Sequence, residues 1–515
     1  MQELSINALA RISAVIVVSL VLGFGFDYLF IDRALGIGFP LYIIFIILGL
    51  LLLATTFQKQ INKRIIWLMI PLGFFSLMIF VRSNGLLHAI DIIATIIILL
   101  IIAKLIPKGR IKNLLTKDYF KILLLPLWFI EPFFKTISDL IKLFAVSKNQ
   151  KIISKISKGV IIAIPILAFF ILLFSSADVI FRKYVVDLLD INLKQATIYH
   201  IFFVSVVTLI FMGAYSYIFN KKEPKLKSEE EQDTKKSRLG RVETYTFLGL
   251  VNLLFLVFIL IQLVYLFGGE SNVTSQALTY AEYARRGFFE LIAIAVASFL
   301  LLRVTEILVE KRDSIHTLIF KILSCALIAQ VSLIMISAFK RLWLYEQVFG
   351  FTTLRLYSQA FIFLLAAIFI ILLIKIVMDE KDNVLAFRSF IAVLLFLAVM
   401  NIFNPDAFIA KKNIDLSKES GKLDMMYLYR LSDDAVPVMI EAYKLPHLDD
   451  EYGAVMASNL YWRLELKKST NFFNDWQSFN ISRNKAENLL ESNIEELEKY
   501  KNFTPSQNIL YQNYR

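Results

Sequence analysis

Charged and aromatic side chains crowd the stretch Thr279 to Glu290, directly before a long apolar run. At helical spacing Glu282, Arg286 and Glu290 fall on one face. A glutamate at this depth is costly in lipid unless it is paired, buried in the bundle or open to water, and Arg286 is its nearest partner at i, i+4. Because guanidinium groups suit phosphate and carboxylate, the stretch predicts a binding face for an anionic group. The alternative is that Arg285 and Arg286 only anchor a helix at the headgroup level.

A second pair of polar side chains lies inside another apolar run. Asp91 is about five residues into its predicted helix, roughly 7 Å deep at about 1.5 Å per residue, and His88 precedes it by one turn. Ionisable groups at that depth are functional candidates, although they also serve as interhelical hydrogen bonds and ion pairs that specify packing. The full set of candidate ligand-binding residues is His88, Asp91, Tyr280, Glu282, Tyr283, Arg285, Arg286, Glu290, Arg341, Arg355 and Tyr357.

Familiar catalytic and cofactor-binding patterns are missing from the sequence. There is no P-loop, no G-x-G-x-x-G after a strand and no G-x-S-x-G elbow, so ATP-driven transport within the chain and the usual hydrolase chemistry have no support. A metal site can be drawn from His88, Asp91 and His200, but no spacing such as H-E-x-x-H supports it. The single cysteine, Cys325, excludes an intrachain disulfide framework. We expect no catalytic residues, no metal and no cofactor.

Composition places these residues in a membrane. Of 515 residues 57% are hydrophobic, 45 are Phe and the mean hydropathy is +0.64, which is far too apolar for a soluble globule. The net charge of +12 does not imply nucleic acid, because residues 404–515 are slightly acidic and the basic excess lies among the apolar runs. The predicted fold is an all-α polytopic membrane protein with membrane lipids as partners. Eleven spans are predicted, at about 12–31, 38–57, 65–81, 86–107, 159–177, 196–219, 244–268, 287–309, 315–339, 354–378 and 385–403.

Basic residues in the short connections predict the orientation. Lys and Arg concentrate after the second, fourth and sixth spans, whereas the connections after the first and third offer only Arg33 and Arg82. The positive-inside rule therefore predicts a cytoplasmic N-terminus and, with an odd number of spans, a C-terminal region outside. The polar side chains Lys104, Arg303, Glu306 and Lys375 then lie near inner ends, where long side chains can snorkel.

The chain divides into four parts by composition. These are a membrane part with six spans at 1–219, which includes an interfacial segment at 118–146, a charged cytoplasmic linker at 220–242, five further spans at 243–403 and a soluble helical domain at 404–515. Amphipathic periodicity in the last part predicts helices at 434–445, 449–467 and 482–500. Trp462, Trp476 and the Phe472–Phe473 pair could dock this domain on the membrane part, but aromatic residues more often serve as ordinary core.

Three stretches resemble a family of bacterial multi-pass membrane proteins that is classified as a domain of unknown function. They are Tyr280-Ala-Glu-Tyr-Ala-Arg-Arg-Gly-Phe-Phe-Glu290, Gly350-Phe-Thr-Thr-Leu-Arg-Leu-Tyr357 and Asn404-Pro-Asp-Ala-Phe-Ile-Ala410. The resemblance covers roughly residues 240–412. It implies a bacterial cytoplasmic membrane and a membrane fold, and it names no reaction.

Three functional hypotheses follow. The first is a polar vestibule on the outer face that binds a small polar, anionic or lipid-linked ligand in transport, as a receptor or in envelope assembly, with Arg286, Arg341 and Arg355 holding the anionic group. The second is an enzyme similar in layout to glycosyltransferases that use polyprenyl-linked sugars, with Asp27 and Asp32 as its acidic residues. The short first outer loop counts against it. The third is a structural or signalling anchor for the C-terminal domain, whose protein partner is unknown. The sharpest expectation is that Arg286, Glu290 and Arg355 form one cluster.

Overall fold

The computed structural model is helical, without strands, in the part of the chain that it describes. That part comprises residues 2–106, 110–144, seven positions between 174 and 184, 195–220, 240–267, 288–309, 314–420, 423–444 and 450–503. Among these residues ten helices are long and apolar enough to cross a membrane. They coincide with ten of the predicted spans and confirm an all-α polytopic membrane protein. The remaining predicted span, 159–177, lies outside the described residues except for two positions near its end.

The chain folds into two compact units. Unit 1 comprises Met1–Ile111, Lys117–Lys225 and Lys467–Asn484. Unit 2 comprises Lys112–Thr116, Leu226–Leu466 and Lys485–Arg515. The C-terminal region therefore contributes residues to both units.

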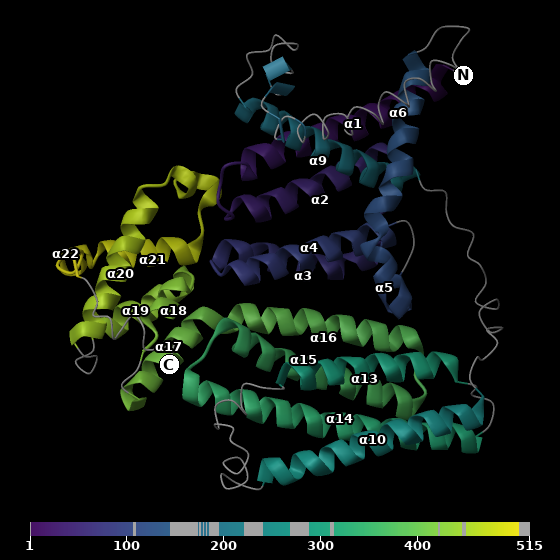
Figure 1. Ribbon diagram of the computed structural model, residues 1–515. Helices are drawn as coiled ribbons and strands as arrows, with labels where there is room; N and C mark the ends of the chain where they lie inside the picture. The colour runs from purple at the N-terminus through teal and green to yellow at the C-terminus, as the bar shows by residue number, and fades with distance from the viewer. Residues whose placement is uncertain are drawn as a thin grey trace. The chain divides into compact units, whose positions relative to one another are not determined.

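Unit 1 contains five long apolar helices that run side by side (Figure 1). They are α1 (Gln2–Phe30), α2 (Gly38–Thr56), α3 (Ile66–Val81), α4 (Gly85–Leu105) and α9 (Gln195–Asn220). Two shorter helices, α5 (Thr116–Leu123) and α6 (Ile130–Phe144), run across the axes of the long ones, and α6 packs on α1 and α9. Asn84 caps the start of α4, since its side chain accepts a hydrogen bond from the Leu87 N–H at 2.9 Å.

The two ends of unit 1 can be told apart by contacts of α9. Its first turns lie where α1 ends, since His200 contacts Asp27 at 2.7 Å. Its last turns lie beside α6, where the hydroxyls of Thr136 and Ser216 are 2.7 Å apart. The chain thus leaves α6 at one end of unit 1 and enters α9 at the other, as a span at 159–177 would require. That span stays a prediction.

Unit 2 contains five further long helices around an apolar core. They are α10 (Arg241–Phe267), α13 (Phe288–Leu308), α14 (Ser314–Phe349), α15 (Thr353–Met378) and α16 (Asp382–Phe403). With 36 residues α14 is about 54 Å long at about 1.5 Å per residue, against about 30 Å of bilayer hydrocarbon. The helix is therefore longer than an apolar core of that thickness.

Short helices gather at the end of unit 2 where α14 ends and α15 begins, which we call the domain end (Figure 1). They are α17 (Pro405–Ser420), α18 (Met425–Arg430), α19 (Val436–Tyr443), α20 (Asp450–Lys468), α21 (Ile481–Glu491) and α22 (Ile494–Glu498). Asn404 ends α16 in the left-handed region (φ 56°), and Pro405 starts α17, where its missing N–H costs nothing. A core around Leu428, Met456 and Leu490 joins these helices.

Candidate functional site

Arg355 is fixed at the domain end of unit 2 by contacts along one side of its guanidinium group. Its Nη1 donates to the carbonyl oxygens of Phe349, the last residue of α14, at 3.1 Å, and of Gly350, the residue after it. The guanidinium carbon lies 4.1 Å from the ring centroid of Tyr345. Its Nε and Nη2 atoms donate no hydrogen bond to any residue that the structure describes. Arg355 therefore combines a fixed position with three N–H donors that can serve a ligand.

Glu346 lies next to this arginine and is completely buried. Its Oε2 accepts a hydrogen bond from the side-chain amide of Gln359 on α15, and Arg355 acts on it electrostatically. Its Oε1 is buried and accepts no hydrogen bond within the described chain. Because an unsatisfied buried carboxylate oxygen is costly, this atom calls for a hydrogen-bond donor that the described residues do not supply.

Arg341 lies on a different side of α14. It is buried, and its Nη2 donates to Gln262 of α10 at 2.5 Å, where Ser337 also donates at 3.2 Å. Five residues of helix turn the direction of the side chain by about 140° at about 3.6 residues per turn, so Arg341 faces α10 while Glu346 faces α15. The expected joint role of Arg341 and Arg355 in one anion site is therefore not supported by this arrangement.

Two of the three family-like stretches meet at the joint between the membrane helices and the short helices of unit 2, where the ring centroids of Phe351 and Phe408 are 5.8 Å apart. The Phe351 N–H donates to Asn413 at 2.6 Å, and Asn413 returns a hydrogen bond to the Phe351 carbonyl at 2.9 Å. Tyr427 binds both the N–H and the hydroxyl of Thr353. Gly350 has φ +74° and an added Cβ would lie 2.8 Å from Asn413 Oδ1, so glycine is required there. Asn413 and Tyr427, which follow the stretch 404–410 in the chain, thus hold the turn that carries Arg355.

His88 and Asp91 are buried in unit 1 on α4, and for Asp91 this is the position expected of a carboxylate that avoids lipid. The His88 Nε2 lies 2.6 Å from the Arg82 carbonyl, which can only accept, so this nitrogen carries the hydrogen. Asn480 donates to the same carbonyl at 2.6 Å and to that of Ile79 at 3.0 Å. These hydrogen bonds join α3, α4 and the segment Lys467–Asn484, which indicates a structural role for His88.

His200 stands between two carboxylates at the start of α9. Its Nδ1 lies 2.7 Å from Asp27 Oδ1 and its Nε2 3.7 Å from Asp32 Oδ2. The two aspartates that the enzyme hypothesis would use therefore already share a histidine. Across the described residues no group of three His, Cys, Asp or Glu side chains is arranged to hold a metal ion.

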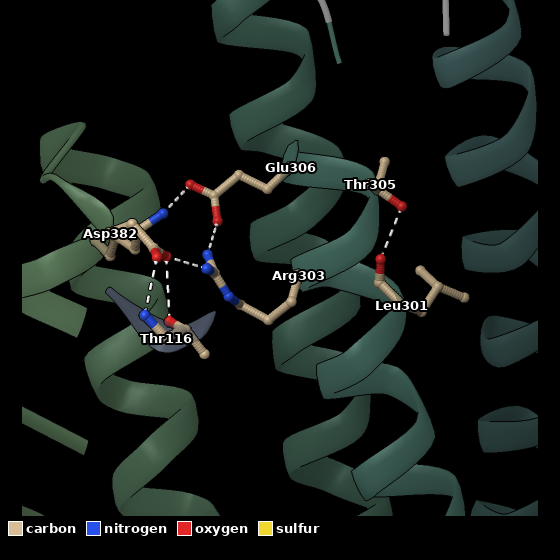
Figure 2. A network of polar contacts seen from close by, with 7 residues as sticks. Thr116, Leu301, Arg303, Thr305, Glu306 and Asp382 are labelled. Atoms are coloured by element: carbon tan, nitrogen blue, oxygen red, sulfur yellow. Dashed lines mark hydrogen bonds and ion pairs between the residues drawn. The ribbon is translucent and has the colours of Figure 1, made fainter. Parts of the chain in front are cut away.

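A buried network of charges closes the opposite end of unit 2 (Figure 2). Arg303 of α13 bonds to Glu306 and to Asp382, and Glu306 also accepts from Lys375 of α15. Thr116 completes it with its N–H and hydroxyl at 3.3 and 3.4 Å from Asp382. Arg303, Glu306 and Lys375 are each at most 9% exposed. The expectation that these side chains snorkel outward is wrong, because each finds an opposite charge on a neighbouring turn or helix.

The remaining predicted residues do not assemble with Arg355. Tyr280, Glu282, Tyr283, Arg285 and Arg286 lie outside the described residues. Glu290 is exposed on the first turn of α13 and has no ion pair with a described residue, so its expected interior position and its pairing with Arg355 are not seen. Tyr357 is half-buried on α15.

Sequence reasoning missed Glu346 and Gln359. The predicted span ended at residue 339, whereas α14 continues to Phe349. The signal was present, since positions 340–349 contain no proline or glycine that would stop the helix. Sequence reasoning also missed Asp382, which pairs with Arg303. The predicted spans end at 378 and begin again at 385, so this residue was placed in a connection.

Comparison with models of protein families gives a match. A family model described as a domain of unknown function, DUF4153, matches residues 69–442. Neither curated proteins nor solved structures yield a match.

Proposed function

The chain belongs to the DUF4153 family of domains of unknown function, and we propose on that premise that it is a non-enzymatic membrane protein that binds a small polar, anionic or lipid-linked ligand at the domain end of unit 2. One observation carries the proposal. Arg355 is held in place by backbone carbonyls while its Nε and Nη2 donate to no described residue. A phosphate or carboxylate can receive two parallel hydrogen bonds from such an edge.

Two features beside Arg355 indicate which chemical groups the ligand carries. Glu346 Oε1 lacks a donor, which favours a ligand, or a bound water, that also offers a hydroxyl or amine. Phe349, whose carbonyl accepts from Arg355, and Leu354, the residue before that arginine, are 50% and 62% exposed, which suits a ligand with an apolar tail. A lipid-linked anion combines these properties.

The test uses retention of phosphatidic acid by the full-length protein in detergent, measured by native mass spectrometry. Arg355→Gln should lower retention about tenfold or more, because a hydrogen bond to a charged group contributes about 1.5–3 kcal/mol. Arg355→Lys should retain an amount of phosphatidic acid between those of the wild type and Arg355→Gln, since an ammonium group keeps the charge but lacks the planar pair of donors. Arg388→Gln is the matched control, because Arg388 pairs with Glu380 at 2.6 and 2.9 Å at the opposite end of unit 2. Equal loss in Arg355→Gln and the control, or no loss in either, would refute the proposal.

We further infer a bacterial cytoplasmic membrane, with the N-terminus inside and residues 404–515 outside. The support is the concentration of basic residues after α2 and α4, which the positive-inside rule places in the cytoplasm. In a Cys325→Ser background, Ser469→Cys should react with a membrane-impermeant maleimide on intact cells and Lys63→Cys only after permeabilisation. The reverse pattern would contradict the orientation.

A further inference from the structure

Several basic segments converge at the end of unit 1 opposite His200, which we call the basic end. The connection after α2 touches the end of α4, where Asn62 donates to the Leu105 carbonyl at 3.4 Å. The end of α4 in turn touches α5 through the ion pair of Lys104 and Asp118 at 3.4 Å. Residues 59–67, the last turn of α4, and α5 to α6 therefore form one surface.

The segment from α5 to α6 has two apolar faces with different surroundings. One face is buried in unit 1 and includes Ile122, Leu125, Phe129 and Phe133. The other is exposed and includes Phe120 (67%), Leu123, Leu124, Leu127, Trp128 (65%) and Ile130. Because unit 1 leaves this second face uncovered and the helices run across the membrane helices (Figure 1), the face fits an interface-parallel helix.

The start of α3 repeats the same combination of residues. Lys63 and Arg64 are exposed directly before Ile66 (67%) and Trp67 (74%). Tryptophan is enriched at membrane interfaces because its ring is apolar and its N–H is polar. Two separate segments of the basic end thus carry both exposed basic residues and an exposed indole ring.

The charges of the basic end have one predominant sign. The exposed basic residues are Lys63, Arg64, Arg110, Lys117, Lys121 and Lys135. Among the described residues of α5 and α6, Glu131 is the one exposed acidic side chain. A surface with this excess of cations around exposed aromatic groups is complementary to negative headgroups over an acyl layer.

We propose that the basic end of unit 1 is a binding surface for anionic phospholipid headgroups, separate from the ligand site at Arg355. The ammonium and guanidinium groups contact the headgroup phosphates, while Phe120, Trp128 and Trp67 enter the boundary with the acyl chains. The surface thereby holds α5 and α6 against the leaflet and gives the protein a lipid preference.

The test measures lipids retained by the full-length protein from equimolar mixed micelles of phosphatidylglycerol and phosphatidylcholine, counted by native mass spectrometry. The wild type should retain phosphatidylglycerol preferentially. The variant Lys63→Gln, Arg64→Gln, Lys117→Gln, Lys121→Gln should lower the ratio of the two lipids about tenfold or more, and added salt should lower it in the wild type. The control variant replaces four exposed lysines of the C-terminal domain, namely Lys411, Lys412, Lys485 and Lys499, by Gln.

A second variant separates charge from apolar contact. Trp67→Ala with Trp128→Ala should reduce retention of both lipids to the same extent and leave their ratio unchanged. The proposal is overturned if the wild type shows no preference or if the control loses the preference as the basic variant does. It is also overturned if the basic variant keeps the wild-type ratio, which would assign the surface to a different occupant such as an acidic protein.

Discussion

Replacing Glu306 by Gln tests whether the buried network of unit 2 stabilises the fold. The substitution keeps the shape of the side chain and removes the one carboxylate that Arg303 and Lys375 share. The side chains of all three residues are at most 8% exposed, so little solvent screens the charge that remains. Removing one partner of a buried ion pair costs about 3–5 kcal/mol, and we expect Glu306→Gln to lower the free energy of unfolding by that amount.

The assay is equilibrium unfolding by sodium dodecyl sulfate in mixed micelles, with Lys375→Met and the double variant completing a cycle. Because Lys375→Met removes the charge that Glu306→Gln leaves behind, the double variant should lose less than the sum of the single losses. Asp415→Asn is the control, since Asp415 and Lys418 form an exposed pair that contributes about 0–1 kcal/mol. Strict additivity, or a loss in Glu306→Gln no larger than in the control, would refute the reasoning.

Three further outcomes are expected. Gly36→Ala should detach the segment Lys467–Asn484 from unit 1, because an added Cβ would lie 2.6 Å from the Ser478 carbonyl oxygen; faster limited proteolysis of the segment checks this. Asn413→Leu should lower the melting temperature through the loss of two hydrogen bonds to the α14–α15 turn, about 1–3 kcal/mol in all, and an unchanged melting temperature would contradict that role. Tyr443 donates to Glu496 at 2.6 Å and lowers the pKa of that carboxylate, which adds stability above about pH 4 that is lost as the pH falls. Tyr443→Phe should therefore weaken the loss of stability in acid, measured as melting temperature against pH.

The membrane helices could be predicted from sequence because hydropathy is a local property. A carboxylate such as Asp91 inside an apolar run has to avoid lipid, and it is buried in the structure. The partners of charged residues could not be predicted, because pairing depends on which helices are neighbours. Glu306 and Lys375 meet although 69 residues separate them. Sequence spacing identifies only possible partners on the same helix. For this reason the long charged side chains were expected to reach the membrane surface and not to pair with another helix.

In the C-terminal region, too, the sequence predicted the helices but not their neighbours in space. Its helices were predicted from their apolar periodicity, yet the segment Lys467–Asn484 belongs to unit 1. The interpretation of Trp476 and Phe472 as core residues is wrong, since they are 53% and 47% exposed. The ring centroid of Trp476 instead lies 6.4 Å from that of Tyr28 near the end of α1. The Phe472 carbonyl accepts a hydrogen bond from the Ala34 N–H at 3.2 Å. The sequence around an aromatic residue does not show whether its ring is buried in a core or contacts another part of the chain.

A cryo-electron microscopy map of the full-length protein in nanodiscs that contain phosphatidic acid tests the proposed ligand site most directly. We predict non-protein density within hydrogen-bonding distance of the Arg355 Nε and Nη2 atoms, with a polar group near Glu346 Oε1. A map in which a carboxylate of the chain itself occupies that edge of Arg355 would contradict the proposal.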